Sequence, residues 1–290
     1  WSESFIFLLL KDNSKALELI AQFRPFTGKI ASYYELTKTK QDETLLINSF
    51  LGSREFSYTI EHFAGSSVHF SQNSEKGLLA IIDFLNHQMG NNSYQIDINS
   101  NAMFIPAKPS ETELFVQYGV FDPLQTLLIY GFVDQQTPFI YSGLFELELP
   151  SGELLCNLAF AGKAKRAGSL PKELVHLRQI LPAGIQKQGN KVGVTDIIIP
   201  DASEKHLLYG VVEHILVTVN PMRYQNKASL KADTEKVLVS IIQVNLAFWQ
   251  DFQQQVTELL SPELAKKSQL LSLSQVYIDK LTQFEIHTEQ

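Results

Sequence analysis

Four short pairs of chemically capable residues lie in the first half of this 290-residue chain. They are Ser53-Arg54, Asn86-His87, Tyr118-Gly119 and Tyr130-Gly131. An arginine guanidinium binds carboxylates through two parallel hydrogen bonds, and the face of a tyrosine ring attracts cations. A single Asn-His or Tyr-Gly pair is more typical of a turn or a helix end than of a site. The order and spacing of the four pairs therefore carry the functional interpretation.

Each pair belongs to a longer motif. In chain order the motifs are Ser53-Arg54-x-Phe56, Asp83-x-x-Asn86-His87, Glu113 followed by Tyr118-Gly119, and Leu127-Leu128-x-Tyr130-Gly131-Phe132. This order resembles the SET-domain protein methyltransferases, in the branch of the Rubisco large-subunit lysine methyltransferase, which includes a histidine methyltransferase. Residues 170–178 are similar to the opening of that family's helical substrate-binding domain. The resemblance thus extends over most of the chain.

The resemblance implies a cofactor and the residues that bind it. The cofactor is S-adenosylmethionine, and Asn86 and His87 would hold its adenosyl part. Arg54 would lie near its carboxylate, which suits the geometry of a guanidinium. The reaction requires no metal ion.

The resemblance also implies an acceptor site. Tyr118 would be the catalytic tyrosine, beside the sulfonium and the acceptor nitrogen, and Ser53, Asp83 and Tyr130 would line the acceptor channel with it. Methyl transfer is an in-line displacement, so positioning supplies much of the rate. A lysine acceptor must lose its proton, which costs roughly 4.6 kcal/mol at pH 7 from a pKa of about 10.4. A dry channel lined by tyrosine lowers that pKa by desolvation.

Departures from the family keep two other functions open. The family's Gly-x-Gly loop has no equivalent here, and the chain begins, at Trp1, where the family's helical insert would begin. We therefore expect the first half of the SET core to be absent from these 290 residues. Glu111-Thr112-Glu113 stands where Gly-Glu-Glu is usual, and Pro123 where Asn is usual. The alternatives are a noncatalytic protein-binding module that retains a partial SET core, and a protein-histidine methyltransferase.

Hydrophobic periodicity indicates the elements that must position these residues. Apolar spacing predicts helices over 3–23, 41–51, 171–181, 204–219, 229–260 and 262–281, whereas alternation predicts strands near 94–98, 102–105, 114–116 and 144–149. We expect an α+β protein with SET-like small β-sheets and a helical insert, followed by an all-α C-terminal domain. The expected divisions are 1–56 for the helical insert, 57–162 for the C-terminal half of the SET core, and 163–290 for the helical substrate-binding-like domain. The aromatic residues 248, 249 and 252 are expected to be core.

Composition excludes several function classes. The net charge of -7 argues against nonspecific nucleic-acid binding, which depends on Lys and Arg. The longest apolar run, residues 5–10, is too short to span a bilayer, and the histidines lack the spacing of a zinc site. A single cysteine, Cys156, excludes an intramolecular disulfide and favours a reducing compartment. We expect an intracellular protein, cytoplasmic or nuclear, whose partner is a protein substrate.

Overall fold

The computed structural model describes residues 7, 14–26, 28–54, 56–59, 74–77, 86–87, 95–97, 102–104, 115–116, 121–158, 181–182, 184–195, 197–259 and 267–286. The helices are α2 Ser14–Phe23, α3 Gly28–Lys38, α4 Asp42–Arg54, α5 Pro123–Tyr130, α6 Lys205–Val219, α7 Lys227–Leu259 and α8 Lys267–Ile286, with 3-10 turns η5 Ala202–Glu204 and η6 Arg223–Gln225. The strands are β1 Phe56–Thr59, β2 Ser74–Gly77, β3 Asn86–His87, β4 Gln95–Asp97, β5 Ala102–Phe104, β6 Phe115–Val116, β7 Phe139–Tyr141, β8 Phe145–Glu148, β9 Leu154–Leu158, β10 Ile185–Gln188, β11 Lys191–Thr195 and β12 Ile198–Pro200.

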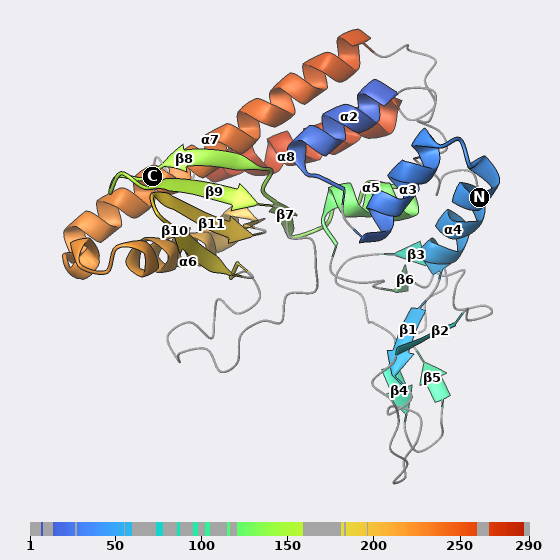
Figure 1. Cartoon of the computed structure of the whole chain (residues 1–290), viewed down its shortest axis with the longest axis horizontal. Coiled ribbons are helices and arrows are strands. Elements are labelled where there is room, and N and C mark those ends of the chain that lie inside the picture. The colour runs from blue at the N-terminus through green and yellow to red at the C-terminus, as the bar shows by residue number, and fades with distance from the viewer. Residues whose placement is uncertain are drawn as a thin grey trace.

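The larger sheet has four strands in the order β10-β11-β9-β8. β11 pairs with β9 in parallel, and the other two pairs are antiparallel hairpins. Gly152, at a φ of 92°, makes the turn between β8 and β9, which explains why a glycine follows the predicted strand there. α6 and α7 pack against this sheet on the left of the molecule (Figure 1).

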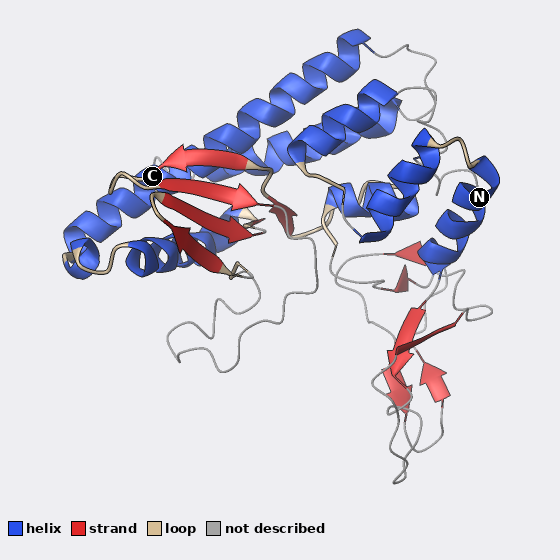
Figure 2. Cartoon of the chain, viewed as in Figure 1, coloured by secondary structure: helices blue, strands red, loops and turns tan. Residues whose placement is uncertain are grey.

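Four other pairs are two-stranded: β1-β2, β4-β5, β3-β6 and β12-β7. The first three are drawn at the lower right, apart from the long helices (Figure 2). β12 and β7 pair antiparallel, with Ile199 opposite Ile140, and both of these side chains are buried. β7 is therefore the strand that joins the α5 region to the segment before α6.

The helices meet at an aromatic cluster. Trp249 of α7 stacks on Tyr277 of α8 with ring centroids 4.1 Å apart, and Phe23 of α2 lies 4.6 Å from Trp249. Trp249 and Phe252 are buried, and Phe248 packs against the core, which confirms the expected core role of residues 248, 249 and 252. Such rings dominate core energetics because each removes a large apolar area from water.

A polar junction ties α7 to the sheet beside this cluster. Asn245 accepts a hydrogen bond from the Gly143 amide at 2.8 Å, and Asn157 donates one to the Gly143 carbonyl at 2.7 Å. A Cβ on Gly143 would lie 2.4 Å from the Phe23 ring, so the position requires glycine. Buried amide side chains of this kind fix a single packing because each lost bond leaves a polar group unsatisfied.

The α+β class and several predicted elements are confirmed. α4, α6 and α7 match the predicted helices, and β4, β5, β6 and β8 match the predicted strands. The prediction of an all-α region after residue 162 is wrong where the strands β10, β11 and β12 occur, at 185–188, 191–195 and 198–200. Two strand pairs, β11-β9 and β12-β7, cross the boundary predicted at 162/163. α3 and α5 do not correspond to any predicted helix, and residues 171–180 of the helix predicted over 171–181 lie outside the described residues.

Candidate functional site

The Asn-His pair forms a short strand beside the segment that leads to the first tyrosine. β3 and β6 pair in parallel, with Asn86 opposite Phe115 and His87 opposite Val116. β6 ends two residues before Tyr118. The pairing thus brings together two of the motifs singled out in the sequence. Tyr118 and Asp83, and the side chains of Asn86 and His87, lie outside the described part.

Ser53 and Arg54 are the last two residues of α4, and α4 packs on α5. The Tyr33 hydroxyl of α3 donates a hydrogen bond of 3.0 Å to the Asn48 carbonyl and so ties α3 to α4. The side chains of Ser53 and Arg54 are outside the described residues, so the structure places them by their backbone alone.

α5 explains the second Tyr-Gly pair. Asp122 caps the helix, accepting from the Gln125 amide at 2.8 Å, while the Gln125 side chain accepts from the Asp122 amide at 3.2 Å. Pro123 occupies the first turn, where its missing N–H costs nothing. Gly131 ends the helix at a φ of 80°, a left-handed conformation that glycine adopts without steric cost. Gly131 therefore has a structural role, and Tyr130 is the final helical residue.

Tyr130 lies within a group of aromatic rings and is half-buried. Its ring is edge-on to Phe121, with centroids 5.6 Å apart, and 6.2 Å from the ring of Phe132. Tyr130, the last residue of α5, thus contacts Phe121, which precedes the cap of the same helix. An aromatic surface of this type suits a cationic ligand.

A buried carboxylate holds the start of α5. Asp122 is fully buried, and its Oδ2 accepts hydrogen bonds from the Tyr141 amide at 3.2 Å and from the Tyr277 hydroxyl at 2.6 Å. Burial, and next the negative charge of Asp122, raise the pKa of Tyr277 well above its usual value. The positive charge of Arg24, whose guanidinium lies 4.2 Å from the centre of the Tyr141 ring, acts in the opposite direction on that pKa. Tyr277 therefore stays protonated and donates to the carboxylate.

Two hydroxyls complete the support of α5. The Thr137 hydroxyl donates to the Phe121 carbonyl at 3.4 Å. The Thr126 hydroxyl donates to the Pro123 carbonyl at 3.0 Å and accepts from the Asp134 amide at 3.2 Å. Thr126 and Thr137 are both fully buried. The loop between α5 and β7 is thereby fixed to the helix and to Phe121 before its cap.

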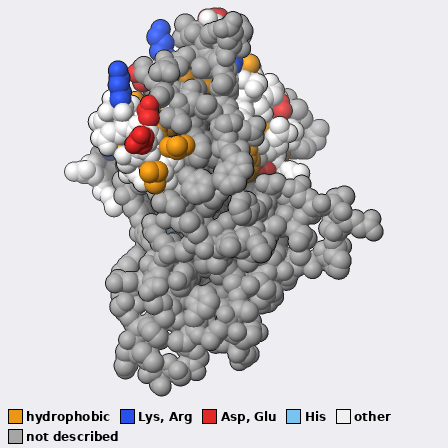
Figure 3. Space-filling model, turned by 90° about the vertical axis from the view of Figure 1, so that its right-hand side faces the viewer, with side chains coloured by type: hydrophobic (Ala, Val, Ile, Leu, Met, Phe, Trp, Pro, Cys, Tyr) orange, Lys and Arg blue, Asp and Glu red, His pale blue; other side chains and the backbone are white. Residues whose placement is uncertain are grey.

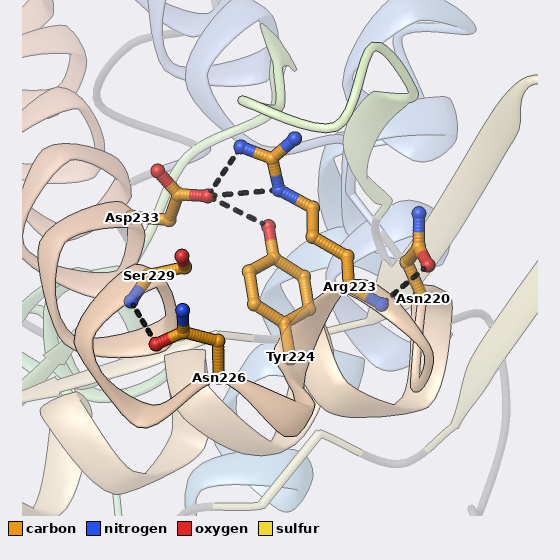
Figure 4. A network of polar contacts seen from close by, with 6 residues as sticks. All are labelled: Asn220, Arg223, Tyr224, Asn226, Ser229 and Asp233. Atoms are coloured by element: carbon orange, nitrogen blue, oxygen red, sulfur yellow. Dashed lines mark hydrogen bonds and ion pairs between the residues drawn. The ribbon is translucent and has the colours of Figure 1, made fainter.

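A second buried tyrosine–aspartate pair lies at the corner between α6 and α7 (Figure 4). Asp233 accepts from Arg223 Nε and Nη2 at 3.1 and 2.9 Å, and from the Tyr224 hydroxyl at 3.2 Å. Asn226 caps the start of α7 by accepting from the Ser229 amide at 3.3 Å. All of these residues belong to one turn and the helix that follows, so this cluster is local in sequence.

A groove of about 960 Å³ runs between α6 and α7. Its described lining includes Lys205 and Tyr209 from α6 and Glu235, Lys236 and Val239 from α7, and none of the motif residues. Burial raises the pKa of Tyr209, with the charges of Glu213 and Glu235 adding to the effect. A groove of this size falls within the range of small-molecule sites, but its mixed charges define no single class of ligand.

The surface on the α4 side of the molecule exposes a few hydrophobic side chains beside charged ones (Figure 3). Leu46 and Ile47 of α4 are 42% and 56% exposed. Isolated exposed apolar side chains of this number are ordinary on protein surfaces. They define no separate candidate site.

Other chemistries find little support among the described residues. The described part contains no group of three or more His, Cys, Asp or Glu residues arranged to hold a metal ion. Burial and the neighbouring Glu146 raise the pKa of the Cys156 thiol, which disfavours the reactive thiolate. Among the described helices, none is both long enough and apolar enough to cross a membrane.

No protein-family model matches the chain, and no curated protein matches it in sequence. The interpretation of the site therefore depends on the motif residues and on the pairing and packing of the elements that carry them.

Sequence reasoning missed Asp122 and Tyr277. Asp122-Pro123-x-Gln125 has the form of a capping box with proline in the first turn, followed by Gly131 at the helix end, and this signal could have predicted α5. Tyr277 carries no comparable signal. It is one apolar position among many on an amphipathic helix, and only the packing of α8 reveals that its hydroxyl reaches Asp122.

Proposed function

We propose that this protein transfers a methyl group from S-adenosylmethionine to a side chain of a protein substrate, with the ε-amine of lysine as the acceptor. The observation that carries the proposal is the parallel pairing of β3 with β6. It sets the Asn86-His87 backbone beside the strand that leads into Tyr118. The same motifs in the same order characterise the SET-domain methyltransferases that the sequence resembles.

The chain's own residues then have distinct tasks. Asn86 and His87 hold the adenosyl group, and Arg54 at the end of α4 pairs with the carboxylate of the cofactor. When bound, S-adenosylmethionine supplies a methyl group on a positively charged sulfur. The Tyr118 hydroxyl would orient the neutral acceptor nitrogen in line with the methyl carbon and the sulfur that the methyl group leaves. The lysine proton leaves to solvent, and removal of water from the channel lowers the energy that this loss requires.

Tyr130 supports the acceptor channel from α5. Its contacts with Phe121 and Phe132 hold the ring at the end of a helix whose two ends are capped. Aromatic faces stabilise an alkylammonium or sulfonium cation by roughly 0.5–2 kcal/mol, depending on exposure. Ser53 and Asp83 complete the channel in this proposal.

Calorimetric titration of the full-length protein with S-adenosylmethionine tests the proposal. We expect saturable binding, and we expect Asn86→Ala to weaken it by about 1–3 kcal/mol because buried hydrogen bonds are lost. Asn220→Ala is the matched control, since Asn220 lies at the corner after α6 and its side chain is described in one hydrogen bond, from the Arg223 amide. It should leave the affinity unchanged.

Two outcomes would contradict the proposal. Folded full-length protein that binds no S-adenosylmethionine would favour the noncatalytic protein-binding module. Equal affinities for wild type and Asn86→Ala would show that the Asn-His pair has no part in the cofactor site.

A further inference from the structure

We infer that Asp122 and Tyr277 are positioning residues for the reaction: α8, close to the C-terminal end of the described chain, anchors the segment that connects the two candidate tyrosines. This inference rests on the proposed function, because it assigns a catalytic consequence to the way α5 is held. Neither residue belongs to the motifs that suggested the function.

Asp122 joins α5 to β7, the next strand along the chain, and to α8, where its partner Tyr277 is 155 residues away. Its Oδ1 caps α5, and its Oδ2 bonds both the Tyr141 amide of β7 and the Tyr277 hydroxyl of α8. Asp122 and Tyr277 are both fully buried, so no water replaces a lost bond cheaply. The 2.6 Å bond to Tyr277 is short, as expected for a hydroxyl that donates to a carboxylate.

The anchor acts on both candidate tyrosines through the chain. Tyr118 precedes Asp122 by four residues, and a segment of that length spans at most about 14 Å. Tyr130 ends the helix that Asp122 begins. A shift of Asp122 should therefore move Tyr130 through the helix that joins them. It should also move the C-terminal end of the four-residue segment that leads back to Tyr118.

Methyl transfer is sensitive to such shifts. An in-line displacement needs its reacting atoms aligned, and a misplacement of about 1 Å can cost about 100-fold in rate. Cofactor affinity depends on Asn86, His87 and Arg54, which lie on β3 and α4. Loss of the anchor should therefore reduce turnover by a much larger factor than the affinity for S-adenosylmethionine, which α5 affects only through its contact with α4.

The chain supplies a chemically matched control. Tyr224 donates to Asp233 at 3.2 Å and is 5% exposed, so Tyr224→Phe also removes one buried tyrosine–aspartate hydrogen bond. That pair lies at the α6–α7 corner and contacts neither α5 nor β7 among the described residues. Any general loss of stability should appear in both variants, whereas a positioning effect should appear in Tyr277→Phe alone.

The experiment compares wild type, Tyr277→Phe and Tyr224→Phe in the full-length protein. It measures kcat with a protein substrate, affinity for S-adenosylmethionine, and hydrogen exchange of the Thr126 and Gly131 amides. We expect Tyr277→Phe to lower kcat at least tenfold, to change cofactor affinity less than twofold, and to speed exchange in α5. Tyr224→Phe should match wild type in all three.

A second variant covers the case in which Tyr277→Phe does not fold. Asp122→Asn retains a helix cap but turns one of the two oxygens into a donor, which conflicts with the Tyr141 amide. It should show the same fall in kcat.

The outcomes separate the two proposals. Equal kcat for Tyr277→Phe, Tyr224→Phe and wild type overturns the inference while the proposed function survives. Wild type that neither binds S-adenosylmethionine nor transfers methyl overturns the proposed function. In that case the catalytic role of Asp122 and Tyr277 is also overturned. Faster hydrogen exchange of α5 in Tyr277→Phe would then show that the pair stabilises the structure and nothing more.

Discussion

The same pair of side chains, a buried tyrosine donating to a buried aspartate, occurs in two regions of this molecule with different consequences. Asp233 and Tyr224 are nine residues apart and close a corner between consecutive helices. Asp122 and Tyr277 are 155 residues apart and join α5 to α8. The first pair stabilises a turn, and the second fixes the relative position of two distant parts of the chain.

The two carboxylates also differ in how their charge is compensated. Asp233 faces the Arg223 guanidinium, whose side chain is 41% exposed. Asp122 is fully buried and accepts from two backbone amides and one hydroxyl, and the charge of Arg24 acts on its partner Tyr277. Backbone donors cannot rotate away, so the Asp122 cluster is the more rigid of the two and the less tolerant of change.

The largest expected effect is on stability. Asp122→Ala removes the cap of α5 and leaves the Tyr277 hydroxyl and the Tyr141 amide without their acceptor. We expect a loss of about 3–5 kcal/mol in the free energy of unfolding, as for other broken buried charge networks. Asp233→Ala should lower the free energy of unfolding by clearly less, because the partly exposed Arg223 guanidinium can be hydrated without moving. Urea denaturation of both variants gives the comparison.

The opposite order of destabilisation would contradict this comparison. Should Asp233→Ala destabilise the protein more than Asp122→Ala, the corner between α6 and α7 would be the more important junction, and α8 would not depend on its bond to α5.

The smallest expected effect concerns salt. Raising sodium chloride from about 0.1 M to about 1 M shortens the screening distance from about 10 Å to about 3 Å. The coupling between Arg223 and Asp233, measured by a double-mutant cycle, should fall over this range because the guanidinium is partly exposed. The coupling between Tyr277 and Asp122 should not change, since a buried pair without a full positive charge is barely screened.

Equal salt dependence in the two cycles would indicate that water reaches Asp122. The cluster would then be less rigid than its burial implies, and its value as an anchor would be reduced.

Much of the helical framework could be predicted from sequence, because a long amphipathic helix has an apolar residue on its buried face every three to four residues. α6 and α7 were predicted within a few residues for this reason. β10, β11 and β12 were not predicted. β10 and β11 are short strands connected by a turn at Gly189 and Asn190. Residues 197–200 are all buried, so the apolar pattern there does not distinguish a strand from a helix.

The candidate site was less accessible to sequence reasoning. The motifs could be found because they are short and ordered, and β6, expected near 114–116, is confirmed. The parallel pairing of β3 with β6 depends on contacts between segments far apart in the chain, which no local pattern specifies. The contact of Tyr277 with Asp122 depends likewise on how α8 packs, whereas the capping box at Asp122 is a local signal in the sequence.

The most direct test of the account is transfer of labelled methyl from S-adenosylmethionine to a protein acceptor by full-length wild type and Tyr118→Phe. The ring remains in Tyr118→Phe, so the fold should persist, whereas loss of the hydroxyl that orients the acceptor should lower kcat by about 100-fold. Acid hydrolysis of the product should place the label on lysine. Full activity in Tyr118→Phe would contradict the catalytic assignment, and label recovered on histidine would replace lysine as the acceptor.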